Sequence, residues 1–211
     1  QYLTGIAYFR HLEIEVGPGV LVPRPESELL VEEVLTHINN LEKKIDGEIS
    51  VIDLGAGSGA LSLAIATEAP RSRVIAVEKS TEAIEWLKKN VAKISENVRV
   101  VEGDVAEVLP GVKCDIVIAN PPYIPNSQTL PRDVAEHEPH IALFGGETGM
   151  ELPQRFINAA ARLLKTGGVL AIEHTEDQGA AIDAVLSKEF NEIVLHQDLT
   201  GRPRWTSAVR K

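Results

Sequence analysis

The stretch ISVIDLGAGSGAL, residues 49–61, decides how the rest of the chain is read. Its first half is a short apolar run, which is typical of a buried strand, and its second half places three glycines before a helical pattern. Gly55, Gly57 and Gly59 let the backbone turn sharply and approach a ligand without Cβ clashes. The helix that follows offers unpaired N–H groups at its N-terminus. The stretch therefore predicts a strand–loop–helix unit that binds a nucleotide-like cofactor.

The spacing of these glycines fits two classes of cofactor. Gly55-x-Gly57-x-Gly59 fits methyltransferases that bind S-adenosylmethionine, whereas Gly55-x-Gly57-x-x-Ala60 fits the dinucleotide fingerprint of NAD-dependent oxidoreductases. The loop by itself leaves both classes open.

Strands and helices alternate along the chain around this unit. We expect strands at 49–55, 72–80, 98–104, 114–120 and 169–174, two late strands near 192–197 and 204–210, and helices from 25, over 60–69 and 81–94, and around 150–164 and 177–189. Repeated strand–helix units predict a parallel sheet with helices on both faces. The last two strands have no helix between them, so we expect them to pair as a hairpin and form an antiparallel edge.

The first residues carry a different pattern. FRHLEIEVGPGVLV, residues 9–22, alternates apolar and polar side chains, then places Gly17-Pro18-Gly19 before a second apolar run. This pattern predicts a β-hairpin with its turn at those three residues. We therefore divide the chain into a hairpin and linker over residues 1–24 and a main domain over residues 25–211.

Composition excludes several classes of function. The 211 residues include 21 basic and 31 acidic side chains, a net charge of -10, which argues against a nucleic-acid partner because such proteins neutralise phosphates. No stretch of about 18 apolar residues predicts a membrane span. No signal peptide is visible, so we expect a cytoplasmic protein. Cys114 is the only cysteine and the six histidines show no ligand spacing, so no metal site is expected.

Acidic residues stand at the ends of the predicted strands. Glu78 ends the second strand, where an acid can accept hydrogen bonds from both ribose hydroxyls of an adenosine, and Asp104 ends the third, where an acid can meet an adenine amino group. Asp53 precedes the glycine loop, and both a brace for the loop and a direct contact with the cofactor amine remain open for it. Because ligands of open α/β sheets bind at the carboxyl ends of the strands, we expect these groups to face one crevice.

The fourth strand ends in an unusual sequence, IVIANPPYIPN, residues 116–126. Asn120 carries one carbonyl acceptor and one NH2 group, and the two prolines hold the chain extended. Tyr123 adds a flat apolar face with a polar tip. We interpret Asn120 and Pro121 as a rigid pair of acceptors beside a planar wall, which suits a planar NH2 group of an amide or a base. Hydride transfer does not need such a pair.

Together these motifs resemble class I S-adenosylmethionine-dependent methyltransferases that act on planar nitrogen through Asn-Pro-Pro-Tyr. More narrowly, they resemble the protein-glutamine N5-methyltransferases that modify peptide chain release factors. VLVPRPESE, residues 20–28, is similar to that family's Pro-Arg-Pro-Glu-Thr-Glu signature with Ser27 in place of threonine, and DLTGRPR, residues 198–204, matches the family's ending. Glu173 and Gln178 match a further block, whereas His174, Thr175 and Trp205 depart from the family's usual residues.

The resemblance implies a Rossmann-like fold with a mostly parallel seven-stranded sheet, an antiparallel C-terminal edge and an N-terminal hairpin. It implies S-adenosylmethionine as cofactor, and the glutamine of a release factor's Gly-Gly-Gln loop as acceptor. The residues it assigns to the cofactor are Gly55, Ala56, Gly57, Ser58, Gly59, Glu78, Asp104, Val105 and Asn120. It assigns the acceptor to Asn120, Pro121, Pro122, Tyr123 and Arg24, and catalysis to Asn120, Pro121 and Tyr123. Both contact with the cofactor pocket and a surface ion pair remain open for Arg24 and Glu28.

Three other functions remain as alternatives. An amino-methyltransferase acting on DNA or RNA would use Asn-Pro-Pro-Tyr equally well, because an exocyclic base amine is also planar. An NAD-dependent oxidoreductase would use only the glycine loop, and a binding module would keep the fold without the reaction. We also expect a monomer, and a chain without the helical domain that helps the family to grip the release factor.

Overall fold

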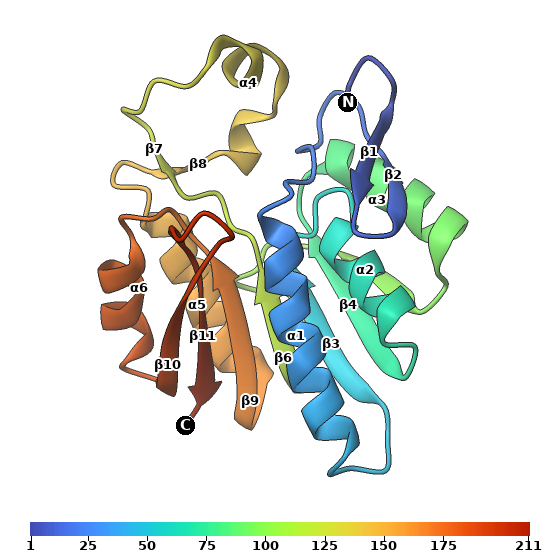
Figure 1. The fold of residues 1–211 in the computed structure, drawn as a ribbon, viewed down its shortest axis with the longest axis vertical. Coiled ribbons are helices and arrows are strands. Elements are labelled where there is room, and N and C mark those ends of the chain that lie inside the picture. The colour runs from blue at the N-terminus through green and yellow to red at the C-terminus, as the bar shows by residue number, and fades with distance from the viewer.

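A seven-stranded sheet runs through the middle of the molecule, whose computed structural model describes residues 1–211 (Figure 1). In spatial order its strands are β10 (Phe190–Gln197), β11 (Pro203–Arg210), β9 (Leu164–Glu173), β6 (Cys114–Ala119), β3 (Ile49–Leu54), β4 (Ser72–Glu78) and β5 (Val98–Glu102). The five strands from β9 to β5 are parallel, whereas β11 runs antiparallel to both of its neighbours. The predicted fold class, with its antiparallel C-terminal edge, is confirmed.

The strand order reverses beside β3. The chain first builds outward from β3 to β4 and β5, then returns to place β6 on the other side of β3. The connections that leave β3 and β6 therefore diverge at their carboxyl ends, and such a switch point is where open α/β sheets bind ligands. The glycine loop follows β3 and the Asn-Pro-Pro-Tyr segment follows β6, so the topology brings the two motifs together.

Helices cover both faces of the sheet because its inner strands are apolar on both faces. Val51 packs with one core, together with α1 (Ser27–Glu42), α2 (Ala60–Glu68) and α3 (Thr81–Ile94). The next residue, Ile52, packs with the opposite core beneath α5 (Glu151–Leu163) and α6 (Gly179–Leu186). This alternation follows from the two-residue period of a strand, and it is typical of parallel sheets. None of these helices has the length and apolar character that a membrane span requires.

The N-terminal hairpin is present, but its turn lies earlier than predicted. Strand β1 (Ile6–Phe9) pairs with β2 (Leu12–Glu15) through a turn at Arg10 and His11. The Arg10 backbone N–H donates to Glu28 of α1 at 2.9 Å, and its guanidinium pairs with Glu32 and Glu68. Gly17, which we expected in the turn, instead packs against the indole ring of Trp86 on α3. The position of the turn is therefore set by long-range contacts of Arg10 and not by the glycines at 17 and 19.

Residues 1–24 have no core of their own. Phe9 and Ile14 are almost fully buried in the same apolar cluster as the sheet residue Val51. Asn90 of α3 is completely buried between the hairpin and the glycine loop. Its amide links the two, because it hydrogen-bonds the backbone of Glu15 and the carbonyl of Ser58. The hairpin therefore packs as part of the main unit and supports the glycine loop from behind.

The long connection after β6 contains short elements of its own. Strand β7 (Ile124–Pro125) pairs with β8 (Phe144–Gly146), and between them lie α4 (Arg132–His137) and the 3₁₀ turn η1 (His140–Ala142). Gln178 holds the start and the end of this connection together, since its Nε2 donates to the carbonyls of Tyr123 and Gly149. Figure 1 shows α4 and the hairpin standing on either side of the molecule at the carboxyl end of the sheet.

Candidate active site

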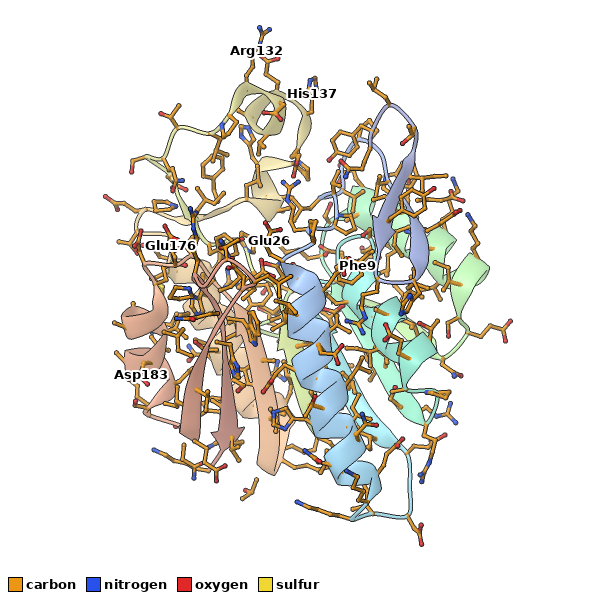
Figure 2. All side chains as sticks on the ribbon, viewed as in Figure 1. Phe9, Glu26, Arg132, His137, Glu176 and Asp183 are labelled. Atoms are coloured by element: carbon orange, nitrogen blue, oxygen red, sulfur yellow. The ribbon has the colours of Figure 1, made fainter.

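A cleft opens at the switch point of the sheet and has an empty volume of about 1080 Å³, its open mouth included. Its floor comes from the ends of β3, β4 and β6, and its walls include Phe9 of the hairpin and Phe156 of α5. Figure 2 places Phe9 at the end of β1. The cleft therefore lies where the strand ends predicted a common crevice.

Most of the predicted site residues line this cleft. They are Arg24, Gly55, Ala56, Gly57, Ser58, Glu78, Asp104, Val105, Asn120 and Pro122. Gly59, Pro121 and Tyr123 belong to the same segments but are not among the lining residues, and neither are Asp53 and Glu28. The structure thus brings the two motifs to one cavity. Within each motif, some residues line the cavity and the others lie behind the lining.

The glycines of the loop have different tasks. Gly55 and Gly57 line the cleft with φ of 74° and 56°, a left-handed conformation that favours glycine. Gly59 instead caps α2 with φ of 87°, and a Cβ there would lie 2.6 Å from Cδ1 of Leu87 on α3. Gly59 therefore lets α2 and α3 pack closely, and its place in the motif reflects helix packing rather than contact with a ligand.

The Glu78 carboxylate already accepts three backbone hydrogen bonds. Its Oε2 accepts from Gly57 at 2.8 Å, and its Oε1 accepts from Lys79 and Ser80 at 2.8 and 2.9 Å. A carboxylate has about four lone-pair sites, so Glu78 can accept one further bond in this arrangement. Accepting from both ribose hydroxyls, as the sequence suggested, would require one of these three bonds to open.

Asp104 stands on the cleft wall between two cations. Its Oδ1 lies 3.0 Å from Arg155 and its Oδ2 lies 3.7 Å from Lys79. The hydrogen bond from the Ala106 backbone N–H lowers the pKa of Asp104, and the two cations act in the same direction. Asp104 is therefore an ionised acceptor, and it also holds α5 against the loop after β5.

Asp53 braces the loop from beneath the cleft. It is fully buried, and its Oδ2 accepts from the Ser62 backbone N–H at 3.1 Å and from the Ser62 hydroxyl at 2.5 Å. Its other oxygen has no partner. The contact with Ser62 secures the first turn of α2 to the end of β3. Of the two tasks left open for Asp53, the structure shows the brace.

Burial of Asp53 predicts a pH-dependent stability. Burial raises the pKa of Asp53 from 3.8 to about 7, so between these values the folded protein keeps a proton that the unfolded chain has released. Stability therefore falls as the pH rises through this window, and Asp53→Asn should fall less steeply. Urea unfolding midpoints measured between about pH 5 and about pH 8 test this. The same dependence of stability on pH in the two proteins would contradict the prediction. A smaller dependence should remain in both, because burial also raises the pKa of Glu173 to about 7.

Asn120 is held by a buried polar network. Its Nδ2 donates to the Ser27 hydroxyl at 3.1 Å, and Ser27 donates to Oε2 of Glu173 at 2.5 Å. The Tyr123 hydroxyl donates to the other oxygen of Glu173 at 3.2 Å. Tyr123 therefore supports Glu173 with its polar tip, and it is not among the residues that line the cleft, where the sequence predicted that it forms a planar wall.

Arg24 and Glu28 separate in the structure. The Arg24 guanidinium lines the cleft and makes two bonds of 2.7 Å to the buried carboxylate of Glu138, which precedes η1. This pair links the linker before α1 to the long connection after β6. Glu28 instead faces the hairpin and accepts from the Arg10 backbone N–H.

The single cysteine lies outside this chemistry. Cys114 is buried at the start of β6, and burial raises the pKa of its thiol to about 12. A thiol with such a pKa is a poor nucleophile at neutral pH. No group of three or more His, Cys, Asp or Glu side chains converges as metal ligands would.

Sequence reasoning missed the residues that hold the site in place. Ser27 and Glu173 entered only as matches to a family pattern, and Asn90 stood only within the helix expected over 81–94. All three are nearly inaccessible to solvent and polar, with exposures of 3%, 2% and 0%. The only sign of these residues in the sequence is a polar side chain at the end of a helix or strand, or on the apolar face of a helix. Such a sign does not identify the residue to which the side chain hydrogen-bonds.

Known proteins match this chain in sequence over nearly its whole length. Residues 27–137 match the family model described as Methyltransferase small domain. The release factor glutamine methyltransferase of Streptomyces coelicolor is 39% identical over 214 residues, which cover 99% of this chain and 74% of that protein. The chain belongs to the release factor glutamine methyltransferase family. The family member of Mycolicibacterium smegmatis is also 39% identical over 214 residues, covering 100% of this chain and 74% of that protein.

A solved structure supports the fold independently. The 16S rRNA N2 G1207 methyltransferase of T. thermophilus, in complex with AdoMet and guanosine, superposes with a TM-score of 0.67 at 22% identity. The match covers 98% of this chain and 50% of that one. The resemblance to release factor glutamine methyltransferases is thus confirmed, and the chain is a methyltransferase rather than an oxidoreductase.

Proposed function

We propose that this chain transfers a methyl group from S-adenosylmethionine to the side-chain amide nitrogen of a glutamine in the Gly-Gly-Gln loop of a peptide chain release factor. One observation carries the proposal beyond family membership. The Asn120 amide lines the cleft with its NH2 group bonded to Ser27, which leaves its oxygen as an acceptor for an incoming NH2 group. A glutamine side chain presents such a group.

The cleft suits S-adenosylmethionine in its chemistry. Left-handed glycines line it and let the backbone approach a ligand closely. Glu78 and Asp104 present acceptors on the β4 and β5 side, and Phe156 presents an apolar surface. Residues 55–58, together with Glu78, Asp104, Val105 and Asn120, would hold the cofactor. When bound there, it supplies an electrophilic methyl group.

The task of the protein is to present an amide nitrogen that is a poor nucleophile. Asn120 and the backbone carbonyl of Pro121 would accept the two protons of the glutamine NH2 group. None of the backbone hydrogen bonds outside the helices and strands ends on the Pro121 carbonyl oxygen, so this oxygen has no such partner, although Pro121 itself does not line the cleft. Two such acceptors stabilise the positive charge that develops on nitrogen, and they fix the direction of its lone pair.

The proposed assembly needs no strong base beside the acceptor. The carboxylates that line the cleft, Glu78 and Asp104, lie on the cofactor side and are already hydrogen-bonded. The proton of the methylated amide can leave after transfer, once the nitrogen is positively charged. We place the reaction in the cytoplasm because the acceptor is a component of translation. We also propose that the chain acts as a monomer.

Mass spectrometry of a release factor incubated with the chain and S-adenosylmethionine tests the proposal. We expect one added methyl group on the peptide that contains Gly-Gly-Gln, and none when that glutamine is replaced by alanine. Parallel reactions with single-stranded DNA and RNA test the amino-methyltransferase alternative. Methylation of nucleic acid with none on the release factor would overturn the proposal, and binding of the cofactor without product on any acceptor would favour a binding module.

A further inference from the structure

Ser27, Asn120 and Glu173 come from three separate parts of the chain and meet in one buried network. Ser27 is the first residue of α1, Asn120 follows β6, and Glu173 is the last residue of β9. Ser27 and Glu173 are 3% and 2% exposed, so water does not compete for their bonds. In such surroundings the direction of each hydrogen bond is set by the donors and acceptors present.

The direction of the network follows from counting protons. An ionised carboxylate only accepts, so the single proton of the Ser27 hydroxyl points to Glu173 across 2.5 Å. The Ser27 oxygen can then only accept from Asn120, 3.1 Å away, so the group facing it is the NH2 of the Asn120 amide. The Asn120 oxygen must therefore lie on the opposite side of the amide. The orientation of Asn120 is thus dictated by a carboxylate that it does not touch.

We propose that Glu173 is the positioning residue of this methyltransferase and that it acts through Ser27 to hold the Asn120 amide with its oxygen toward the acceptor. The proposal rests on the proposed function for the identity of the acceptor, but not for the geometry. With the amide reversed, the NH2 of Asn120 would face the NH2 of the glutamine, and two donors repel each other. The hydroxyl of Tyr123 supports the same state, because it donates to the second oxygen of Glu173.

The charge state of Glu173 gives this arrangement a pH dependence. Burial raises the pKa of Glu173 to about 7, the Glu26 charge adds to the rise, and Ser27, Tyr123 and Arg204 oppose it. Glu26 lies just before α1, as Figure 2 shows, and Arg204 lies on β11. The neighbouring His174 bonds Thr175 and Thr206, and burial lowers its pKa, which favours its neutral form.

Protonation of Glu173 would release the orientation of Asn120. A protonated Glu173 can donate to the Ser27 oxygen, and the Ser27 proton is then free to point to the oxygen of a reversed Asn120 amide. The fraction of correctly oriented enzyme therefore falls as the pH falls through the pKa of Glu173. We expect kcat of the wild-type protein to rise with pH and to level off above about pH 7 to 8.

Kinetics of three variants separate positioning from packing. Ser27→Ala removes the relay, and kcat should fall by about tenfold to hundredfold while the Kd for S-adenosylmethionine stays the same. Ser27→Thr keeps the hydroxyl and should restore most of the lost rate. Glu173→Gln should lower kcat and abolish its rise with pH, because the amide side chain does not titrate. Ser187→Ala, which removes an exposed hydroxyl at the C-terminal cap of α6, is the matched control.

Asp53 provides a second control, because it is the other buried carboxyl whose pKa is raised to about 7. Asp53→Asn should keep the rise of kcat with pH, whereas Glu173→Gln should lose it. Wild-type rates in both Ser27→Ala and Glu173→Gln would overturn the proposal. So would a Ser27→Thr variant as slow as Ser27→Ala, or an unchanged pH profile in Glu173→Gln.

NMR of the Asn120 side-chain NH2 group tests the positioning without any acceptor. In the wild-type protein its resonances should shift with pH at the midpoint of Glu173 ionisation, and the shift should vanish in Glu173→Gln and in Ser27→Ala. Resonances that titrate alike in all three proteins would refute the relay. If the wild-type protein methylates no release factor, only the proposed function fails, and this measurement still decides the positioning.

Discussion

Asn120→Ala is expected to lower kcat for glutamine methylation by about 100-fold to 1,000-fold, the loss that follows removal of one group aimed at a developing charge. The variant deletes the acceptor for one proton of the glutamine NH2 group and the partner of Ser27. Binding of S-adenosylmethionine should weaken far less than the rate, because Asn120 is one of several residues that would hold the cofactor and the glycine loop, Glu78 and Asp104 stay in place. Methyl transfer from labelled cofactor measures the rate, and calorimetry measures the Kd for the cofactor.

Asn126→Ala is the matched control for this variant. Asn126 belongs to the same segment but is exposed and does not line the cleft, so the same deletion should leave the rate unchanged. Turnover of Asn120→Ala at the wild-type rate, with normal binding of the cofactor, would refute the task assigned to Asn120. A loss in both variants would point to disruption of the segment and not to the amide.

Gly59→Ala is expected to lower the free energy of unfolding by about 2 to 5 kcal/mol. Two causes combine at this position. A φ of 87° strains any residue with a Cβ, and the added carbon would lie 2.6 Å from Cδ1 of Leu87 and 3.4 Å from Cδ1 of Leu63. Both leucines are fully buried, so neither can move without opening the core between α2 and α3. Urea denaturation of the two proteins measures the difference.

Gly111→Ala separates these two causes. Gly111 has a φ of 77°, but nothing lies within 4 Å of the Cβ that alanine would add. Its cost should therefore be the backbone strain alone, about 1 to 2 kcal/mol. Equal losses in the two variants would show that Leu87 and Leu63 adapt, and that close packing is not the reason for glycine at position 59.

The alternation of strands and helices was sufficient to predict the sheet and its helices. Each inner strand is apolar on both faces, so the local pattern agrees there with the tertiary structure. Gly167 and Gly168, which precede the strand expected at 169–174, instead lie within β9. The N-terminal hairpin also departs from the local pattern. Its turn lies at Arg10, where no turn signal stands, because three carboxylates on α1 and α2 hold that residue.

The segments that form the candidate site could be predicted from the sequence. The task of each residue within those segments could not. The strand ends indicated the loop, Glu78, Asp104 and Asn120, because parallel strands deliver their carboxyl ends to one edge. Spacing did not distinguish Gly57, which lines the cleft, from Gly59, which packs against Leu87. The two glycines have the same conformational freedom. They are distinguished only by α3, which packs against Gly59 and not against Gly57.

The sequence by itself determined the fold class, the position of the cleft and the chemistry of the Asn120 amide, because these depend on local pattern and on residue type. Only the tertiary structure decided which way that amide points. The partners that orient it, Ser27 and Glu173, lie 93 positions before Asn120 and 53 positions after it, and the bond between them spans 146 positions. A hydrogen bond across such a separation leaves no periodicity in the sequence. Its direction depends on burial, which excludes water, and on the charge of a carboxylate at the end of another strand.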